Sequence, residues 1–263
     1  MAAAPDEETV SVRSEGPVAV VELRRERKLN ALSTGMEERL DAAVGGAEVR
    51  ESRCVVFTGG ARAFSAGADV TEFRDADAAS VAAYYAGAGS VYERIARLPQ
   101  PTLAAISGYC LGGGLELALA TDIRIADSSA DFGLPEVGLG IIPGSGGVLR
   151  LTRAVGPTRA KELILRGRRF DAAEAHAIGL VAEVADDALA RALEIAAELA
   201  ALPPLALRTA KATIDLAAES SREAAILMEQ LAYGMLAQTP DAQDAATAFA
   251  EKRESGSDPE RRL

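Results

Sequence analysis

Short apolar runs and longer stretches with helical spacing alternate along the first two-thirds of the chain. The apolar runs are rich in β-branched residues and are closed by glycines or polar residues, which predicts strands, and the stretches between them predict helices. We expect strands at 18–23, 54–60, 102–106 and 122–126, and helices at 33–44 and 113–120. This alternation is typical of an α/β layer architecture.

The strand signal is lost from about Pro203 onward. Helical stretches remain at 205–217, 221–238 and 241–253, and Asp241 is placed to cap the last of them. A helical region without strands is too small to form a good core alone, so we expect it to pack on a neighbour, in the same chain or in another subunit. The sequence therefore predicts a division into 1–202 and 203–263.

Composition and charge narrow the choice of partners. The chain has 263 residues, of which 49% are hydrophobic and 25% charged, with a formal net charge of -11. Such an acidic chain lacks the basic face of a nucleic-acid-binding protein, and an anionic ligand would need a local basic patch. The acidic start of the chain is not a signal peptide, and prolines interrupt the uncharged run 98–115. We expect a cytoplasmic protein without a membrane partner.

Few residues are available for nucleophilic or metal chemistry. Cys54 and Cys110 lie in apolar surroundings and are expected to be buried thiols. His176 is the only histidine and is expected on a helix surface, and Ser145 lacks a base partner. No cluster with metal-ligand spacing is present, so we expect no metal. Acid–base chemistry then falls to carboxylates, lysines, tyrosines or backbone groups.

Two glutamates stand out because their neighbours are apolar. Glu116 lies in the glycine-rich segment 108–120, within its run LELALA, and Glu136 lies in a glycine-rich segment between Pro135 and Val137. Carboxylates in such settings can hold different protonation states and act as an acid–base pair. The alternatives are a solvated helix edge for Glu116 and a surface loop for Glu136. The glycines, like those of 64–70, allow either close approach of N–H groups to a ligand or simply a tight turn.

These segments together resemble the crotonase (enoyl-CoA hydratase/isomerase) family over nearly the whole chain. The resemblance implies a spiral of ββα turns over 1–202, followed by a helical trimerisation region over 203–263, in a trimer or a dimer of trimers. The motifs occur in the family's order: RERKLNAL at 25–32, FSAGADV at 64–70, GYCLGGGLELALATDIRIA at 108–126, FGLPEVGLGIIPGSGGVLRLTRAVG at 132–156, RRFDAAEAHAIGLV at 168–181 and FAEKR at 249–253.

The resemblance also implies a reaction. The N–H groups of Ala68 and Gly113 match the oxyanion hole that binds the thioester carbonyl. Hydratases of the family carry glutamates at both positions occupied here by Glu116 and Glu136, whereas isomerases commonly keep one. The implied activity is hydration of a trans-2-enoyl-CoA without a cofactor, with Glu116 as base and Glu136 as proton donor. An isomerase, another crotonase-family acyl-CoA enzyme and a non-catalytic acyl-CoA-binding subunit stay open as alternatives.

Binding of the acyl-CoA thioester is implied for a further set of positions. Tyr84 and Tyr85, within 75–92, are expected to line or cover the acyl pocket. In the family the last helix of a neighbouring subunit also reaches the CoA. The residues that match the CoA-binding segments are Arg27, Lys28, Ala31, Ala66, Asp69, Val70 and Thr71, and those on the last helix are Phe249 and Lys252.

Overall fold

The computed structural model describes residues 9–69, 71–72 and 77–255, except for the side chains of residue 88 and of 250–255. Its contacts divide the chain into two compact units, Met1–Ala200 and Ala201–Leu263. The sequence placed this division after residue 202.

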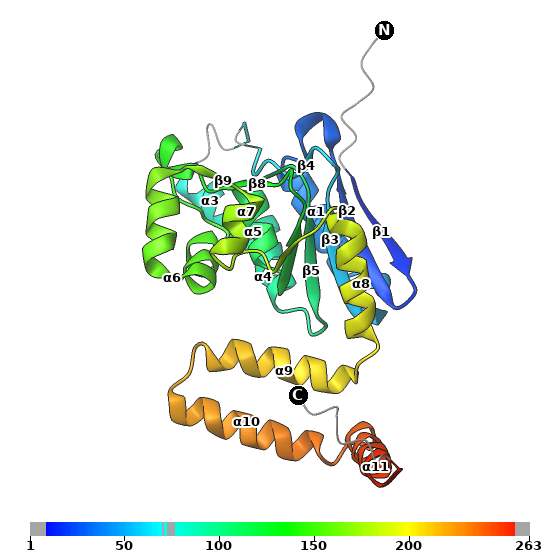
Figure 1. Cartoon of the computed structure of the whole chain (residues 1–263). Coiled ribbons are helices and arrows are strands. Elements are labelled where there is room, and N and C mark those ends of the chain that lie inside the picture. The colour runs from blue at the N-terminus through cyan, green and yellow to red at the C-terminus, as the bar shows by residue number, and fades with distance from the viewer. Residues whose placement is uncertain (1–8, 70, 73–76, 256–263) are drawn as a thin grey trace. The chain divides into compact units, whose positions relative to one another are not determined.

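The larger sheet of the first unit has six strands in the order β1-β2-β3-β5-β7-β10 (Figure 1). Strand β1 is antiparallel to β2, and every other neighbouring pair is parallel. The strands are β1 Thr9–Glu15, β2 Val18–Arg24, β3 Cys54–Thr58, β5 Thr102–Ile106, β7 Ile123–Ala126 and β10 Glu183–Val184. The predicted α/β class is confirmed.

A smaller sheet has the order β4-β6-β8-β9, in which only β9 is antiparallel to its neighbour. Its strands are β4 Ala63–Ser65, β6 Tyr109–Leu111, β8 Asp131–Gly133 and β9 Arg169–Asp171. The helices of this unit are α1 Thr34–Val44, α2 Ala47–Glu51, α3 Ala78–Ala86, α4 Val91–Ala96, α5 Gly113–Leu119, α6 Gly147–Arg166, α7 Ala172–Ala177 and α8 Ala188–Ala200, with short 3-10 turns η1 Glu26–Lys28, η2 Ala88–Ser90 and η3 Glu136–Leu139.

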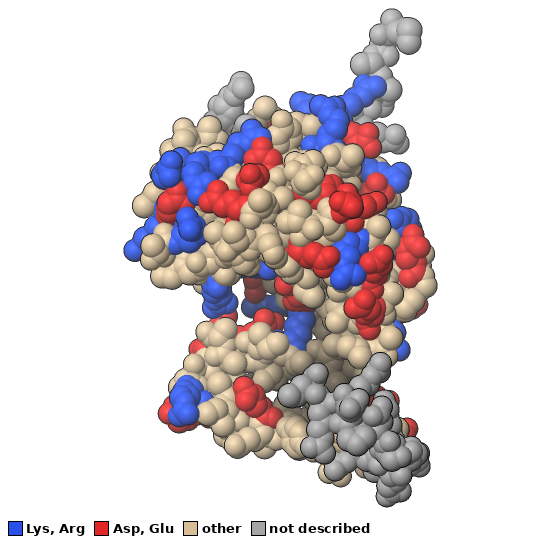
Figure 2. Space-filling view, in the orientation of Figure 1, with Lys and Arg blue, Asp and Glu red and all other residues tan. Residues whose placement is uncertain are grey.

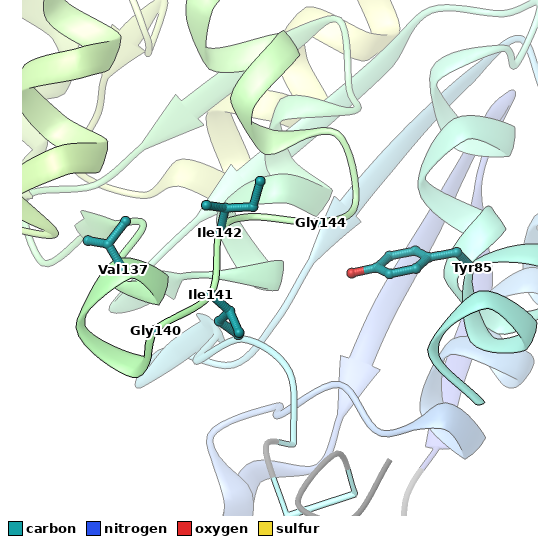
Figure 3. A pocket seen from close by; sticks show the side chains of 6 residues that line it. All are labelled: Tyr85, Val137, Gly140, Ile141, Ile142 and Gly144. Atoms are coloured by element: carbon teal, nitrogen blue, oxygen red, sulfur yellow. The ribbon is translucent and has the colours of Figure 1, made fainter. Parts of the chain in front are cut away.

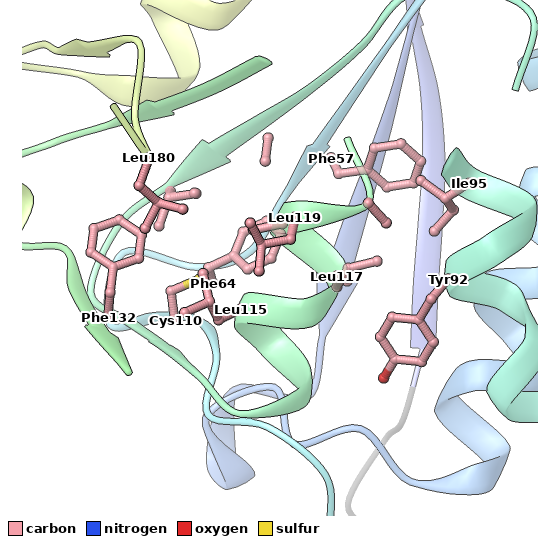
Figure 4. Packing of buried hydrophobic residues seen from close by; sticks show 14 of the residues in the cluster. Phe57, Phe64, Tyr92, Ile95, Cys110, Leu115, Leu117, Leu119, Phe132 and Leu180 are labelled. Carbon is pink, nitrogen blue, oxygen red and sulfur yellow. The ribbon is translucent and has the colours of Figure 1, made fainter. Parts of the chain in front are cut away.

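The central strands β2, β3 and β5 are buried on both faces, which explains why they are apolar runs. Along β2, Val18 and Val20 face the cluster that includes helix α8, whereas Ala19 and Val21 face the main core. Helix α8 presents small side chains at every fourth position, which lets it lie close to the sheet: Ala188, Ala192, Ala196 and Ala200. Figure 4 shows part of the main core around α5.

The six predicted elements of the first unit are confirmed with small shifts at their ends, whereas its other strands and helices were not predicted. Helix α1 begins at Thr34 because the Ser33 hydroxyl caps it, accepting a 3.1 Å hydrogen bond from the N–H of Met36. Strand β1 was not predicted. The start of the second glycine-rich loop, 109–111, forms β6 instead of a turn.

The second unit consists of α9 Pro204–Ala217, α10 Arg222–Leu236 and α11 Pro240–Ser255. Helices α9 and α10 pack on each other, yet neither contains a buried residue. The prediction that Asp241 caps the last helix is wrong. Helix α11 starts one residue earlier, and the Thr239 hydroxyl accepts from the N–H of Ala242 at 3.3 Å. Asp241 lies in the first turn, where its charge still favours the helix dipole.

Cys54 and Cys110 are both buried, as predicted, and burial raises the pKa of Cys110 well above its ordinary value. Among the helices of the described residues, none combines the length and the apolar character that crossing a membrane would require.

Candidate active site

The turn from β6 into α5 contains glycines, so backbone atoms there are not covered by side chains. Gly112 precedes the helix with φ +49°, a left-handed conformation that glycine adopts without strain. A Cβ added to Gly112 would lie 3.1 Å from Oε1 of Glu136. The glycine therefore leaves room for a carboxyl group directly beside the start of α5.

A second backbone segment approaches the same point. Gly67 has φ +101°, and a Cβ added to it would lie 3.4 Å from the nitrogen of Gly113. A Cβ added to Gly113 would likewise lie 3.4 Å from the nitrogen of Ala68. Neither the Ala68 nor the Gly113 N–H donates a hydrogen bond to any of the described residues. Two neighbouring donors without a partner can bind one oxygen atom that carries developing negative charge.

The loop with Ala68 is fixed by backbone hydrogen bonds to the turn after β2. The N–H of Ala66 donates to the Leu29 carbonyl at 2.9 Å, and the N–H of Leu32 donates to the Gly67 carbonyl at 2.8 Å. Asn30 has φ 54°, and its buried side chain donates to the carbonyls of Ala63 and Phe64. An asparagine tolerates this left-handed conformation and here joins both segments.

A buried ion pair holds the far side of the same loop. Nη1 of Arg25 lies 3.0 Å from Oδ2 of Asp69 and also donates to the Ala31 carbonyl at 3.0 Å. Hydrogen bonds from Thr71 and Arg25 keep the pKa of Asp69 below its ordinary value. Asp69 is therefore a charged anchor directly after Ala68.

Glu116 lies on α5 with only 4% of its surface exposed. Its Oε1 accepts hydrogen bonds from the N–H of Ser145 at 2.7 Å and of Gly147 at 2.8 Å, around the start of α6. Burial nevertheless raises the pKa of Glu116 above its ordinary value, although these two N–H groups and Arg150 oppose the effect. Because both backbone donors contact Oε1, Oε2 is the oxygen that can receive a proton from water.

Glu136 begins the 3-10 turn η3 and is half-buried. Its Oε2 is buried without a hydrogen-bond partner among the described residues. Burial, followed by the charge of Glu116, raises its pKa to about 7. The charge of Glu116 thus acts on Glu136, and the surroundings of the two carboxyl groups differ. Glu116 accepts from the backbone of a segment 29 residues away, whereas the backbone N–H that lowers the pKa of Glu136 is its own.

A pocket of about 690 Å³ is lined by residues that neighbour Glu136 and Ser145 in the chain. Val137 follows Glu136 directly, and Gly144 precedes Ser145, whose N–H contacts Glu116. Figure 3 shows the Tyr85 phenol directed toward the loop that carries Ile142 and Gly144. The lining is Tyr85, Val137, Gly140, Ile141, Ile142 and Gly144. Its mostly apolar wall suits an acyl chain.

Comparison with known proteins decides the family. The model of the enoyl-CoA hydratase/isomerase family matches residues 13–257. The chain belongs to this family. It is therefore an enzyme, and it has the crotonase fold that its sequence motifs predicted.

Relatives of this family member are similar along most of their length. It is 40% identical to a short-chain-enoyl-CoA hydratase of Clostridium acetobutylicum, over 93% of this chain and 95% of the relative. It is 39% identical to the mitochondrial methylglutaconyl-CoA hydratase of Mus musculus, over 90% and 78%. The crystal structure of an enoyl-CoA hydratase from Bacillus anthracis superposes with a TM-score of 0.86 at 40% identity, covering 93% and 97% of the two chains.

The structure of this family member brings the four central predicted residues together: Ala68, Gly113, Glu116 and Glu136. Of the predicted CoA-binding residues, Arg27 and Lys28 are exposed on η1, and Ala31, Ala66, Asp69 and Thr71 belong to the two segments that adjoin Ala68. Figure 2 shows Lys and Arg interspersed with Asp and Glu on the visible face of the first unit.

The remaining predicted positions either lie outside the described residues or are not seen at the site, except for Tyr85. Val70 lies outside the described residues, and so does the side chain of Lys252. Phe249 is 64% exposed on α11 of the second unit. Of the two tyrosines expected to line the acyl pocket, Tyr85 lines the pocket described above, whereas the hydroxyl of Tyr84 donates to Glu37.

Several contributors to the site were not predicted. Ser145 was considered only as a nucleophile, but its backbone N–H is what contacts Glu116. Arg25 and Asn30 position the Ala68 loop. The sequence does not distinguish the buried Arg25 from the charged residues around it. His176 is exposed on α7, as expected of a residue without a catalytic role.

Proposed function

We propose that this enzyme is a hydro-lyase, an enoyl-CoA hydratase that adds water to a trans-2-enoyl-CoA and gives a 3-hydroxyacyl-CoA without a cofactor. The hydroxyl of water adds to C3 and a proton adds to C2, so the reaction needs one base, one acid and a site for the charge that develops on the thioester oxygen. The observation that carries the proposal is the pair of unlike carboxyl groups, Glu116 and Glu136, beside two N–H groups that have no partner among the described residues.

The surroundings of the two glutamates favour one assignment of roles. Glu116 accepts two backbone N–H bonds, which stabilise its ionised form, so it is the base that takes a proton from the attacking water. None of the described residues donates to Oε2 of Glu136, and its pKa is about 7, so it can hold the proton that goes to C2. A catalytic acid works best when its pKa lies near the working pH.

The N–H groups of Ala68 and Gly113 form the proposed oxyanion hole. As the nucleophile adds to C3, negative charge moves to the thioester oxygen, and two fixed donors stabilise it without reorganisation. Donors of this kind contribute about 3–4 kcal/mol each in other enzymes that act on acyl groups. The anchors at Asn30 and Asp69 support this proposal because they fix the loop before substrate arrives.

A spectrophotometric assay with crotonyl-CoA tests the reaction. Loss of the conjugated enoyl absorbance, with 3-hydroxybutyryl-CoA as the product, is the expected result. Conversion of a 3-enoyl thioester to the 2-enoyl form without hydration would instead identify an isomerase. Binding of both thioesters without turnover would identify an acyl-CoA-binding subunit. Either of these two results would overturn the hydratase assignment.

The CoA moiety is proposed to lie along the two segments that meet beside Ala68. The first contributes Arg27 and Lys28, whose exposed cations could neutralise phosphates, and Ala31. The second contributes Ala66, Asp69, Val70 and Thr71. The hydrogen bond from the N–H of Asp69 to the Leu32 carbonyl at 2.8 Å keeps the two segments adjacent, which supports one continuous binding surface.

The second unit is proposed to assemble the enzyme into a trimer or a dimer of trimers, and to bring Phe249 and Lys252 to the CoA of a neighbouring subunit. Helices α9 and α10 bury none of their residues, and large apolar side chains on the second unit are exposed, which supports an interface there. They include Leu205, Ile214, Leu216, Leu227, Leu231, Tyr233 and Met235. Sedimentation velocity of the full chain would show a monomer if this proposal is wrong.

A further inference from the structure

A third carboxyl group lies beside the site, and the proposed reaction does not use it. Glu37 belongs to helix α1 and is only 1% exposed. It follows the buried Met36, so it lies on the side of the helix that faces the core, while the next residue, Glu38, is exposed. A buried carboxyl group is costly unless it is hydrogen-bonded, so its partners show what it does there.

Two phenols converge on one oxygen of this carboxyl group. Tyr84 of α3 and Tyr92 of α4 each donate a hydrogen bond to Oε1 of Glu37, both at 2.7 Å. Oε2 is buried without a hydrogen-bond partner among the described residues. Burial raises the pKa of Glu37, while the two phenols oppose the rise. Glu37 thus ties three helices together through one half-satisfied carboxyl group.

The phenol of Tyr92 connects Glu37 to the proposed oxyanion hole. The hydroxyl oxygen of Tyr92 lies 3.3 Å from where a Cβ on Gly113 would be, so it packs against the backbone that carries one of the two proposed oxyanion donors. Tyr92 itself is buried in the main core, where Figure 4 shows it with Ile95 and Leu117. Its ring therefore has little room to move once its hydroxyl is held by Glu37.

The phenol of Tyr84 connects Glu37 to the pocket wall and, through Ser145, to Glu116. The Tyr84 ring meets the Tyr85 ring edge to face, with centroids 4.9 Å apart, and Tyr85 lines the pocket. Burial and the charge of Glu37 raise the pKa of Tyr84, and a hydrogen bond with the Ser145 side chain opposes them. The N–H of Ser145 in turn contacts Glu116. One carboxyl group is therefore connected to both ends of the site.

We propose that Glu37 is a positioning residue: through Tyr92 it sets the place of the Gly113 N–H, and through Tyr84 it holds the pocket wall formed by Tyr85. This inference rests on the proposed oxyanion hole. An apolar residue at position 37 would fill the core without the desolvation cost, as replacements of buried ionic groups in other proteins have shown. Stability alone therefore does not account for a half-satisfied glutamate at this position.

Two substitutions of Glu37 separate positioning from simple packing. Glu37→Gln keeps an oxygen that accepts from both phenols, and Glu37→Leu removes it. We expect the leucine variant to lose about tenfold or more in kcat, since the loss of a buried hydrogen bond corresponds to about tenfold. The glutamine variant should stay within about threefold of the wild type. The matched control is Glu38→Gln on the exposed side of α1, with unchanged kcat and KM. Wild-type kcat and KM in a folded Glu37→Leu protein would overturn the proposal.

Removing each phenol hydroxyl tests the two connections separately, even if Glu37→Leu does not fold. Tyr92→Phe should lower kcat by about threefold to tenfold with little change in KM, and Tyr84→Phe should raise KM by a similar factor with little change in kcat. Combining Tyr92→Phe with Glu37→Leu should be hardly worse than Glu37→Leu alone. The positioning role of Glu37 would be refuted by equal effects of the two phenylalanine variants on kcat and KM, or by additive effects in the double variant.

The outcome does not depend on which reaction the wild type catalyses. If the protein isomerises a 3-enoyl thioester instead of hydrating crotonyl-CoA, hydration is refuted, and the same variants are compared with the thioester that is turned over. Butyryl-CoA, which has no double bond, reports on the pocket wall without turnover. Calorimetry should show weaker butyryl-CoA binding for Tyr84→Phe than for Tyr92→Phe, and the reverse order would contradict the assignment of Tyr84 to the wall.

Discussion

The N–H of Ser145 donates a 2.7 Å hydrogen bond to Oε1 of Glu116, which lies 29 residues earlier in the chain. This bond connects α5, which carries the proposed base, to the start of α6, where N–H groups give the helix end a partial positive charge. The same loop forms part of the pocket wall at Gly144. The orientation of the base is therefore coupled to the loop that an acyl chain would touch.

Replacing the proposed base should remove most of the activity and leave the fold intact. The amide oxygen of Glu116→Gln can still accept from Ser145 and Gly147, but it cannot take a proton from water. We expect kcat to fall by about 10²–10⁴-fold with a modest change in KM. Steady-state kinetics and the melting temperature measure this, with the exposed Glu198→Gln on α8 as control. Near-complete hydration by Glu116→Gln would exclude the two-carboxyl mechanism.

The pH dependence should report the protonation of Glu136. If Glu136 must be protonated to supply the proton to C2, kcat/KM falls as the pH rises through its pKa of about 7. The charge of Glu116 contributes to that pKa, so the residual activity of Glu116→Gln should show the same fall at a lower pH. Initial rates between about pH 5 and 9 test both points. A flat profile above pH 7 would rule out Glu136 as the acid.

The same pKa predicts a pH-dependent change in stability. Between the ordinary value of 4.5 and about 7, the folded protein keeps a proton on Glu136 that the unfolded chain releases. The contribution of this group to stability is therefore greatest below pH 4.5 and is lost as the pH rises toward 7. Glu136→Gln cannot ionise, so it should gain free energy of unfolding relative to the wild type at about pH 8 but not at about pH 4. Urea denaturation at both pH values measures the difference, and Glu198→Gln should show none.

Two glycine-to-alanine substitutions separate the effect of backbone strain from damage to the site. Gly112→Ala would place a Cβ 3.1 Å from Oε1 of Glu136 at a φ of +49°. Gly16→Ala, in the turn between β1 and β2, has a similar φ of +59° but nothing within 4 Å of the new atom. Both should lose about 1–2 kcal/mol of stability from the left-handed conformation. Only Gly112→Ala should also lower kcat, by about tenfold, since it displaces the proposed acid. Equal kcat values for the two variants would show that Glu136 is not held against Gly112.

The sequence predicted most of the site because several of its signals lie in side chains. Glu116 and Glu136 stood out as carboxylates among apolar residues, and both are now seen near the glycine turn. The Ala68 and Gly113 donors are backbone groups, which have no side-chain signature, and they were placed through the family resemblance alone. The N–H of Ser145 was missed for the same reason.

Glu37 was missed for a different reason. Its neighbours Glu38 and Arg39 are charged, so the segment resembles the solvated face of a helix, and only the rotation of α1 about its axis decides which of them is buried. That rotation is set by the packing of Met36, Leu40 and Val44 on the core. The predicted strand positions were easier, because β2, β3 and β5 are apolar runs that are buried on both faces. Asp241 and Thr239 are both good capping residues, and hydrogen-bond geometry alone distinguished them.

The size of the acyl group should depend on Tyr85. Its phenol lies against Gly144 and closes one side of the pocket, although the residue is 41% exposed. Tyr85→Ala removes the ring and should open the pocket, so kcat/KM for 2-decenoyl-CoA should rise relative to that for crotonyl-CoA, by about tenfold if several methylenes gain apolar contact. Tyr85→Phe is the matched control, because it keeps the ring and removes only the hydroxyl, and its chain-length ratio should stay near that of the wild type. Competition between the two thioesters in one reaction gives the ratio directly. An unchanged ratio in Tyr85→Ala would mean that the acyl chain follows another path out of the site.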